Sequence, residues 1–98
     1  PIWLVIRRIR ELAGSRQDDM TKGEYRVGTT FNPSGDDLVN GVKQITAGLI
    51  DEMEKIVLNR GINSEAARCA ALAQTAYEQA AMWAVKAITK QPVPAEVA

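Results

Sequence analysis

The stretch Arg60-Gly61-Ile62-Asn63 decides the fold, because it separates two helical patterns of similar length. Gly61 is typical of a helix end, since glycine readily adopts the left-handed conformation that closes a helix. On either side of this turn, the spacing of apolar and small residues predicts helices over about 35–59 and 64–89. At about 1.5 Å per residue, each helix would be about 37 Å long. A short turn between two such helices predicts an all-α fold, a long antiparallel helical hairpin.

Polar residues mark where each predicted helix begins. The first is preceded by Phe31-Asn32-Pro33-Ser34-Gly35-Asp36-Asp37, in which Ser34 followed by Asp37 is close to a capping box. The adjacent acidic residues suit the positive end of a helix dipole. Asn63 or Ser64 would cap the second helix. Residues 13–35 are rich in glycine and polar side chains, which predicts a loop with a short extended piece at Tyr25 to Thr29.

The N-terminal segment has a helical pattern of its own. Five apolar side chains of residues 2–12 fall on one stripe: Ile2, Val5, Ile6, Ile9 and Leu12. This pattern predicts a short amphipathic helix, and the run is too short to span a bilayer. We favour docking on the hairpin or on a neighbouring subunit over lying on a membrane surface. The expected organisation is an N-terminal helix or extension over 1–19, a hairpin domain over 20–90 and a flexible tail over 91–98.

The second long helix carries more apolar surface than one partner helix can cover. The first has a stripe spaced by four and three residues: Leu38, Val42, Ile45, Leu49, Met53 and Ile56. The second has a seam of small residues, completed by Tyr77: Ala66, Ala70, Ala73, Ala80, Ala84 and Ala87. We expect stripe and seam to pack together, while Leu72, Trp83 and Val85 lie on the other side. A chain of this length buries only about 60–65% of its unfolded surface, so the pattern predicts a homo-oligomer.

Composition argues against several functions. Twelve basic and twelve acidic residues give zero net charge, which is unusual for a general nucleic-acid binder. Histidine is absent, and the single cysteine excludes an internal disulfide and fits a reducing cytoplasm. Asp51 and Glu54 have a spacing that could hold a metal ion, but we expect them to lie on a solvated helix face. With no recognised phosphate loop either, we predict no enzyme activity, no cofactor and no metal site.

Polar residues on the two helices could bind a ligand. On the first, Asn40, Lys43 and Thr46 step by three; on the second, four polar residues share a face: Arg68, Thr75, Gln79 and Lys86. Lys43 lies near the apolar stripe, where an ammonium is costly unless an anion arrives. A cation beside an aromatic side chain, here Phe31 or Tyr25, can bind a nucleotide through its phosphate and base. The alternative is that these rows are solvent-exposed faces.

From Thr21 to Lys90, the chain resembles the hairpin domain shared by phage anti-CBASS proteins and Thoeris anti-defence proteins, which sequester cyclic oligonucleotide and cyclic ADP-ribose signals. The resemblance is carried by Phe31-Asn32-Pro33-Ser34-Gly35, Val42-Lys43-Gln44, Leu49-Ile50-Asp51, Arg68, Ala73-Gln74-Thr75 and the run from Glu78 to Ala87. It covers about seventy of the 98 residues. Residues 1–19 are not matched by the resemblance.

The resemblance implies a helical hairpin that forms dimers and then hexamers in the cytoplasm of an infected bacterial host. It implies capture of cyclic dinucleotides, and of cyclic trinucleotides in a second kind of pocket, without cleavage, so that CBASS effectors are not activated. By the same resemblance, Phe31 or Tyr25 stacks on a base and Lys43 contacts a phosphate. Thr46 and Arg68 line the trinucleotide pocket.

Two other classes of function remain open. The chain could be a small oligomeric structural or adaptor protein whose basic N-terminus docks on a partner. It could also bind nucleic acid through arginines near its N-terminus: Arg7, Arg8, Arg10 and Arg16. A panel of cyclic nucleotides separates the sequestering function from both, whereas salt-dependent DNA binding would favour the last.

Overall fold

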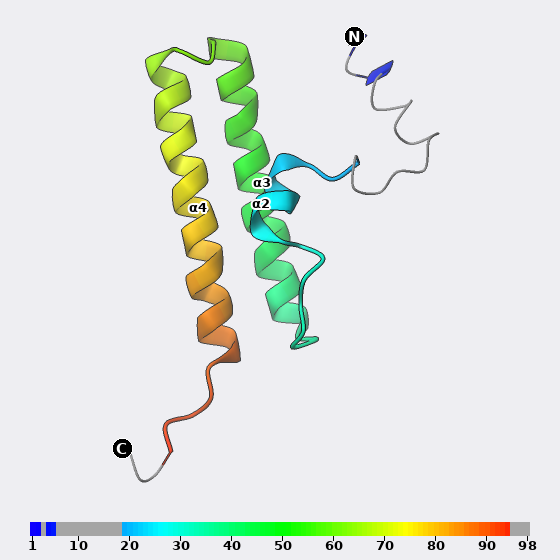
Figure 1. Ribbon diagram of the computed structural model, residues 1–98, viewed down its shortest axis with the longest axis vertical. Helices are drawn as coiled ribbons and strands as arrows, with labels where there is room; N and C mark the ends of the chain where they lie inside the picture. The colour runs from blue at the N-terminus through cyan, green and yellow to red at the C-terminus, as the bar shows by residue number, and fades with distance from the viewer. Residues whose placement is uncertain (3, 6–18, 95–98) are drawn as a thin grey trace.

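The structure, a computed structural model, describes residues 1, 2, 4, 5 and 19–94. Two long antiparallel helices, α3 (Asp37–Arg60) and α4 (Glu65–Thr89), form the hairpin, and a short helix, α2 (Lys22–Val27), lies beside α3 (Figure 1). The all-α hairpin is therefore confirmed. The predicted N-terminal helix within 1–19 and the end of the 91–98 tail lie largely outside the described residues. Within the described part of the chain, no helix is long and apolar enough to cross a membrane.

Both ends of the interhelical turn lie where the sequence predicts them. Gly61 follows α3 with a φ of 95°, which a residue with a Cβ rarely adopts. Ser64 caps α4, because its hydroxyl accepts a hydrogen bond from the Ala67 amide at 3.1 Å. The Ser64 hydroxyl also donates to the Gly61 carbonyl at 2.7 Å, which ties the two helix ends together.

The capping box predicted for the first long helix is wrong in detail. Asp36 is the N-cap of α3, and its carboxylate accepts from the Leu38 amide at 2.8 Å. Ser34 lies too early in the chain to cap the helix, and it instead donates its hydroxyl to the Asn32 side chain at 2.6 Å. A carboxylate satisfies a free amide at this positive helix end more strongly than a hydroxyl does.

The extended piece predicted at Tyr25 to Thr29 is also wrong, because α2 occupies this segment. Thr21 and Glu24 form a complete capping box at its start, with side chain to backbone distances of 3.1 and 3.0 Å. Gly28 ends the helix in the left-handed conformation at a φ of 75°. These two local signals outweigh the loop-like composition of the surrounding residues.

The inner face of α3 differs from the predicted stripe by one position. The buried residues are Val39, Lys43, Ala47 and Ile50, whereas Leu38 and Ile45 are more than half exposed. On α4, Ala70 of the predicted seam is buried, and the other buried residues lie one position after seam residues: Ala67, Gln74 and Ala81. Small side chains let the two helices approach closely, so the bulkier apolar residues remain on the outside of this chain.

Gln74 is a polar side chain that is almost completely buried between the long helices. Its amide nitrogen donates to the Ile50 carbonyl at 3.0 Å and to the Glu54 carboxylate at 3.1 Å. Only 1% of its surface is exposed. Because a buried amide without partners would be costly, these two bonds join α3 to α4 at their middle.

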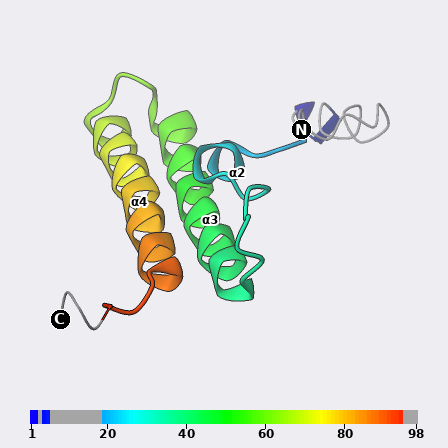
Figure 2. The same cartoon turned by 60° about the horizontal axis from the view of Figure 1, so that its bottom comes forward.

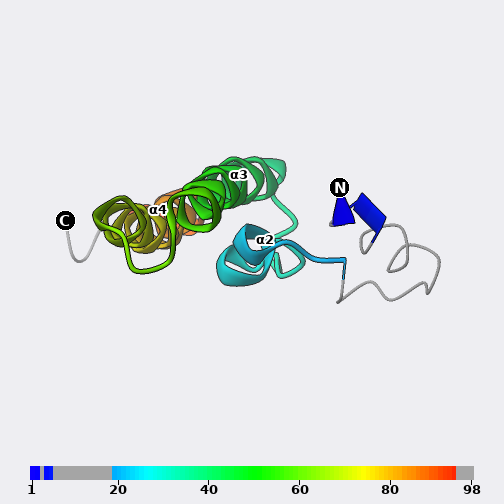
Figure 3. The same cartoon turned by 90° about the horizontal axis from the view of Figure 1, so that it is seen from above.

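Helix α2 packs against one side of the hairpin, close to α3, as the view from above shows (Figure 3). Gly23 makes the closest approach: a Cβ there would overlap the carbonyl group of Ala47, with the carbonyl carbon at 2.7 Å. The Gly23 amide donates to the Asp51 carboxylate at 2.7 Å, and Lys22 pairs with Glu54 at 2.8 Å. Asp51 and Glu54 therefore hold α2 on α3, which corrects their expected placement on a solvated face.

The pairing of Glu54 predicts a pH dependence for the docking of α2. The hydrogen bond from Lys22 lowers the pKa of Glu54 below its ordinary 4.5, and this effect exceeds the opposing effect of burial. A lowered pKa means that the pair stabilises the fold above pH 4.5 and that this contribution is lost as the pH falls through the folded-state value. We expect the NMR amide shifts of residues 22–27 to change in that acidic range.

Glu54→Gln should remove most of this change, whereas Glu52→Gln should not. Glu52 is an exposed carboxylate on the same helix and is paired with Lys55 of its own helix at 2.8 Å. Equal acid transitions in wild type and Glu54→Gln would mean that the Lys22 pair does not hold α2.

Candidate functional site

The structure brings Lys43 and Phe31 together at the loop between α2 and α3. Lys43 lies on the inner face of α3 and is only 7% exposed. Its ammonium donates to the Gly28 carbonyl at 3.0 Å and to the Phe31 carbonyl. The same ammonium lies 5.5 Å from the centroid of the Phe31 ring, within the range of a cation–π interaction. Phe31 as a residue is 69% exposed, which leaves its side chain accessible to a base.

The environment of Lys43 corrects the expectation that its ammonium depends on an incoming anion. Two backbone carbonyl oxygens already compensate for its burial. An ammonium has three donors, so one remains for a further acceptor. Lys43 therefore fixes the loop that carries Phe31 and also keeps a positive charge beside it.

The loop between α2 and α3 is organised by the side chain of Asn32. Its amide nitrogen donates to the Asp36 carbonyl at 3.0 Å and to the Asn40 side chain at 2.9 Å. Its amide oxygen accepts from the Ser34 hydroxyl at 2.6 Å. The neighbouring Phe31 is thus anchored on both sides, by Asn32 and by the hydrogen bond from its own amide to the Gly28 carbonyl at 3.0 Å.

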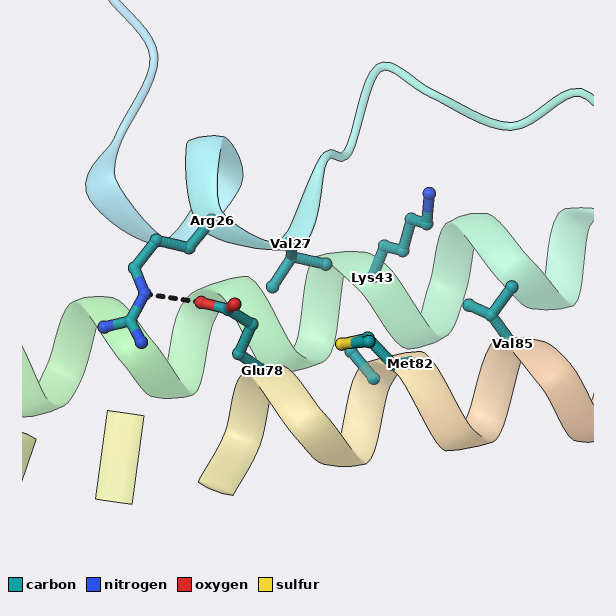
Figure 4. Close-up of a pocket in the computed structure, with 7 residues that line it drawn as sticks. Arg26, Val27, Lys43, Glu78, Met82 and Val85 are labelled. Carbon is teal, nitrogen blue, oxygen red and sulfur yellow. Dashed lines mark hydrogen bonds and ion pairs between the residues drawn. The ribbon is translucent and has the colours of Figure 1, made fainter. Parts of the chain in front are cut away.

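A cavity of about 290 Å³ opens beside Lys43 (Figure 4). Figure 2 shows the three helices that contribute to it. Its lining comes from all three helices: Arg26, Val27, Lys43, Glu78, Ala81, Met82 and Val85. Arg26 of α2 donates to the Glu78 carboxylate of α4 at 2.6 Å, shown as the dashed line in Figure 4. Arg26 also reaches the Thr75 hydroxyl at 3.4 Å.

Sequence reasoning missed Arg26 and Glu78 as members of this site. It treated the segment around Arg26 as loop, so nothing placed that side chain over α4. The capping box at Thr21 and Glu24, followed by Gly28, is the signal that could have revealed a helix there.

Tyr25 is placed differently from the other aromatic candidate. It lies on α2 with 78% of its surface exposed, whereas the centroid of the Phe31 ring lies 5.5 Å from the Lys43 ammonium. Neither aromatic side chain lines the cavity beside Lys43. Within one chain, Phe31 is therefore the aromatic side chain that accompanies the buried cation.

Thr46 and Arg68 do not meet within one chain. The bond from Gln74 to Ile50 sets those two positions level with each other, and Thr46 and Arg68 lie away from that level in opposite directions. Thr46 is four residues from Ile50 on α3, and Arg68 is six residues from Gln74 on α4. At about 1.5 Å per residue, the two side chains are therefore about 15 Å apart along the hairpin axis. Arg68 is exposed and pairs with Glu65 at 3.0 Å, which lowers the pKa of that carboxyl and raises the pKa of the guanidinium.

Comparison with known proteins identifies the family. A family model described as "Acb2/Tad1, hairpin domain" matches residues 23–89, which is more than half of the chain. No match was found among curated proteins or among solved structures. The matched range begins within α2, ends with the last residue of α4 and contains the expected site residues. The resemblance is thus confirmed, and the family consists of sequestering proteins rather than enzymes. The chain belongs to the Acb2/Tad1 hairpin-domain family of anti-CBASS and anti-Thoeris sponge proteins.

Proposed function

We propose that this protein binds cyclic oligonucleotide second messengers of bacterial immunity and withholds them, uncleaved, from the effectors of CBASS. Cyclic dinucleotides are the expected ligands of the site at Phe31 and Lys43. Cyclic trinucleotides are expected at a second kind of pocket, which includes Thr46 and Arg68. The protein would act in the cytoplasm of an infected bacterial host.

The observation that carries this proposal is the pairing of Phe31 with Lys43 inside a matched hairpin domain. An exposed aromatic ring can stack on a base, a contribution of about 1–3 kcal/mol in single-stranded nucleic-acid binders. The adjacent ammonium has one donor free for a phosphodiester oxygen, and charge-assisted hydrogen bonds of this kind are the stronger ones. The two groups together match the two chemical parts of a cyclic nucleotide.

Assembly of several chains, as dimers that form a hexamer, completes the proposed site. Thr46 and Arg68 are about 15 Å apart in one chain, so a pocket that uses both needs a second subunit. Large apolar side chains on the outside of the hairpin support such contacts: Leu38, Ile45, Leu72, Met82 and Trp83 are exposed. Burial of these side chains between subunits would stabilise the assembly.

Capture without cleavage is proposed from the chemistry of the chain. The sequence has no histidine, and Lys43 is paired with an aromatic ring. The carboxylate that lines the cavity, Glu78, is held by Arg26 at 2.6 Å, so we assign it to that ion pair and not to the activation of water. The bound messenger should therefore leave the protein unchanged.

A ligand panel tests the proposed function. Cyclic dinucleotides should raise the melting temperature of the protein, whereas single-stranded DNA should not. Heat denaturation of the complex should release intact ligand on chromatography, and light scattering at micromolar concentration should detect an oligomer. DNA binding that weakens with salt would instead indicate a nucleic-acid binder. A monomer that binds no cyclic nucleotide would indicate an adaptor, and linear product would reveal an enzyme.

A further inference from the structure

The charges around the cavity beside Lys43 are unequal in number. Arg26 and Lys43 are positive and Glu78 is negative, while the other lining residues are apolar. All three charged side chains are partly or fully shielded from water: the side chains of Arg26 and Glu78 are 23% and 36% exposed, and Lys43 is buried. Their net charge of +1 therefore attracts an anionic ligand more strongly than an equal charge on an open surface would.

The cavity has room for part of a cyclic dinucleotide. Its volume of about 290 Å³ lies just below the usual range of about 300–1,000 Å³ for small-molecule sites. Val27, Met82 and Val85 give it an apolar wall that suits a sugar or base edge. One phosphodiester with its neighbouring sugar is therefore the largest unit that we place in this cavity of a single chain.

We propose that Glu78 makes this cavity select singly charged phosphodiesters over terminal phosphomonoesters, and hence cyclic nucleotides over their linear forms. This inference rests on the proposed function. A phosphodiester carries one negative charge and balances the net charge of the cavity. A terminal phosphomonoester carries about −1.5 to −2 at pH 7 and would bring a second negative charge beside Glu78.

Glu78 produces this selectivity by holding the net charge of the cavity at +1. Because Glu78 already holds the Arg26 guanidinium at 2.6 Å, Arg26 cannot neutralise an extra ligand charge without giving up that partner. The uncompensated carboxylate would then lie partly buried beside a like charge, which is unfavourable. A linear nucleotide that arises when a messenger is cleaved would thus compete poorly with the intact cyclic form.

The inference is tested by two matched ligands on four proteins. The ligands are a 3′,3′-cyclic purine dinucleotide and the linear dinucleotide formed by opening one of its phosphodiester bonds, which bears a terminal phosphate. Titration calorimetry at one salt concentration and about pH 7, where the phosphomonoester carries its extra charge, compares wild type, Glu78→Gln, the double variant Arg26→Gln/Glu78→Gln, and Glu52→Gln as a control. Glu52 is an exposed carboxylate of α3 that does not line the cavity.

Wild type and the Glu52→Gln control should prefer the cyclic ligand by about tenfold or more. Glu78→Gln leaves the cavity with a net charge of +2, so it should bind the linear ligand about tenfold more tightly and lose the preference. The double variant returns the net charge to +1 and should regain the preference. This recovery separates a charge effect from a structural role of the ion pair, because the double variant has no ion pair.

A measurement on wild type alone covers the case in which Glu78→Gln fails to fold. The second ionisation of a phosphomonoester lies near pH 6, so at about pH 5.5 the linear ligand approaches a single charge. The ratio of the affinities of wild type for the cyclic and the linear ligand should then decrease.

The inference would be overturned if wild type at the lower pH kept its full preference for the cyclic over the linear ligand. It would also be overturned if Glu78→Gln kept that preference. Either result would leave the proposed function standing. The inference also fails if the double variant behaves like Glu78→Gln. Wild type that binds neither ligand would reject the proposed function and the inference together.

Discussion

Gly23→Ala should detach α2 from the hairpin and reduce cyclic-dinucleotide affinity at least about 100-fold, while α3 and α4 stay helical. The added methyl group would overlap the carbonyl group of Ala47. This group belongs to the backbone of α3, so it cannot move without bending the helix. Withdrawal of α2 would break the hydrogen bond to Asp51 and the two ion pairs to α3 and α4. It would also remove Arg26 from the cavity and displace the loop that carries Phe31, so the ligand would lose a charged and a stacking partner, about 1.5–3 and 1–3 kcal/mol, which supports a change of this size.

The matched control for this substitution is Gly48→Ala. No described atom lies within 4 Å of a Cβ built on Gly48, which is a helical residue of α3. Alanine is favoured over glycine inside a helix by about 0.5–1 kcal/mol, so the control should melt at the same temperature or slightly higher. Hydrogen exchange of residues 22–31 and titration calorimetry compare the two variants. Protection of α2 that survives in Gly23→Ala would show that the close approach is not essential.

Lys43→Ala should weaken cyclic-dinucleotide binding by about 10- to 100-fold, the second large effect that we expect. The change removes the charge proposed to meet a phosphate, a contribution of about 1.5–3 kcal/mol. It also leaves the carbonyl oxygens of Gly28 and Phe31 without their donor, so the ring loses its fixed position. Phe31→Ala should remove a stacking contribution of about 1–3 kcal/mol, whereas Arg68→Ala should spare dinucleotide affinity.

Lys86→Ala provides a matched control, because Lys86 also lies over an aromatic ring. Its ammonium is 5.2 Å from the centroid of Trp83, on an exposed part of α4 that is not in the cavity beside Lys43. Titration calorimetry should give this variant the affinity of wild type within about twofold. If Lys43→Ala binds like wild type while the oligomer stays intact, the assigned role of Lys43 is wrong although the family membership stands.

The hairpin could be predicted from the sequence because its ends are marked by local chemistry. Gly61 and Ser64 act through their own backbone conformation and hydroxyl group, which depend little on distant parts of the chain. The family resemblance was likewise accessible from the order of short motifs along one continuous range. Cyclic-nucleotide ligands and the number of subunits stay predictions.

The inward face of α3 could not be predicted, because apolar periodicity alone cannot say which partner covers a stripe. Leu38 and Ile45 have the expected helical spacing, yet they are exposed in this chain, while Lys43 is buried. A lysine becomes buried here only because a loop folds back and offers two carbonyl oxygens. This compensation depends on where residues 28–31 lie relative to α3 in the folded chain. A hydropathy pattern gives no information about that position.

The bonds of Gln74 have a further consequence, for the axial register of the hairpin. Buried alanines line both sides of the helix interface, Ala47 on α3 and Ala67, Ala70 and Ala81 on α4, so sliding one helix by one turn, about 5.4 Å, would cost little packing. Gln74 makes the turns inequivalent, because in a slipped hairpin its buried amide would lose the Ile50 carbonyl at a cost of about 1–3 kcal/mol. Slippage would also carry Glu78 past Arg26. The amide of Gln74, which does not line the cavity, thus selects the alignment of α3 and α4 on which the charge pattern of the cavity depends.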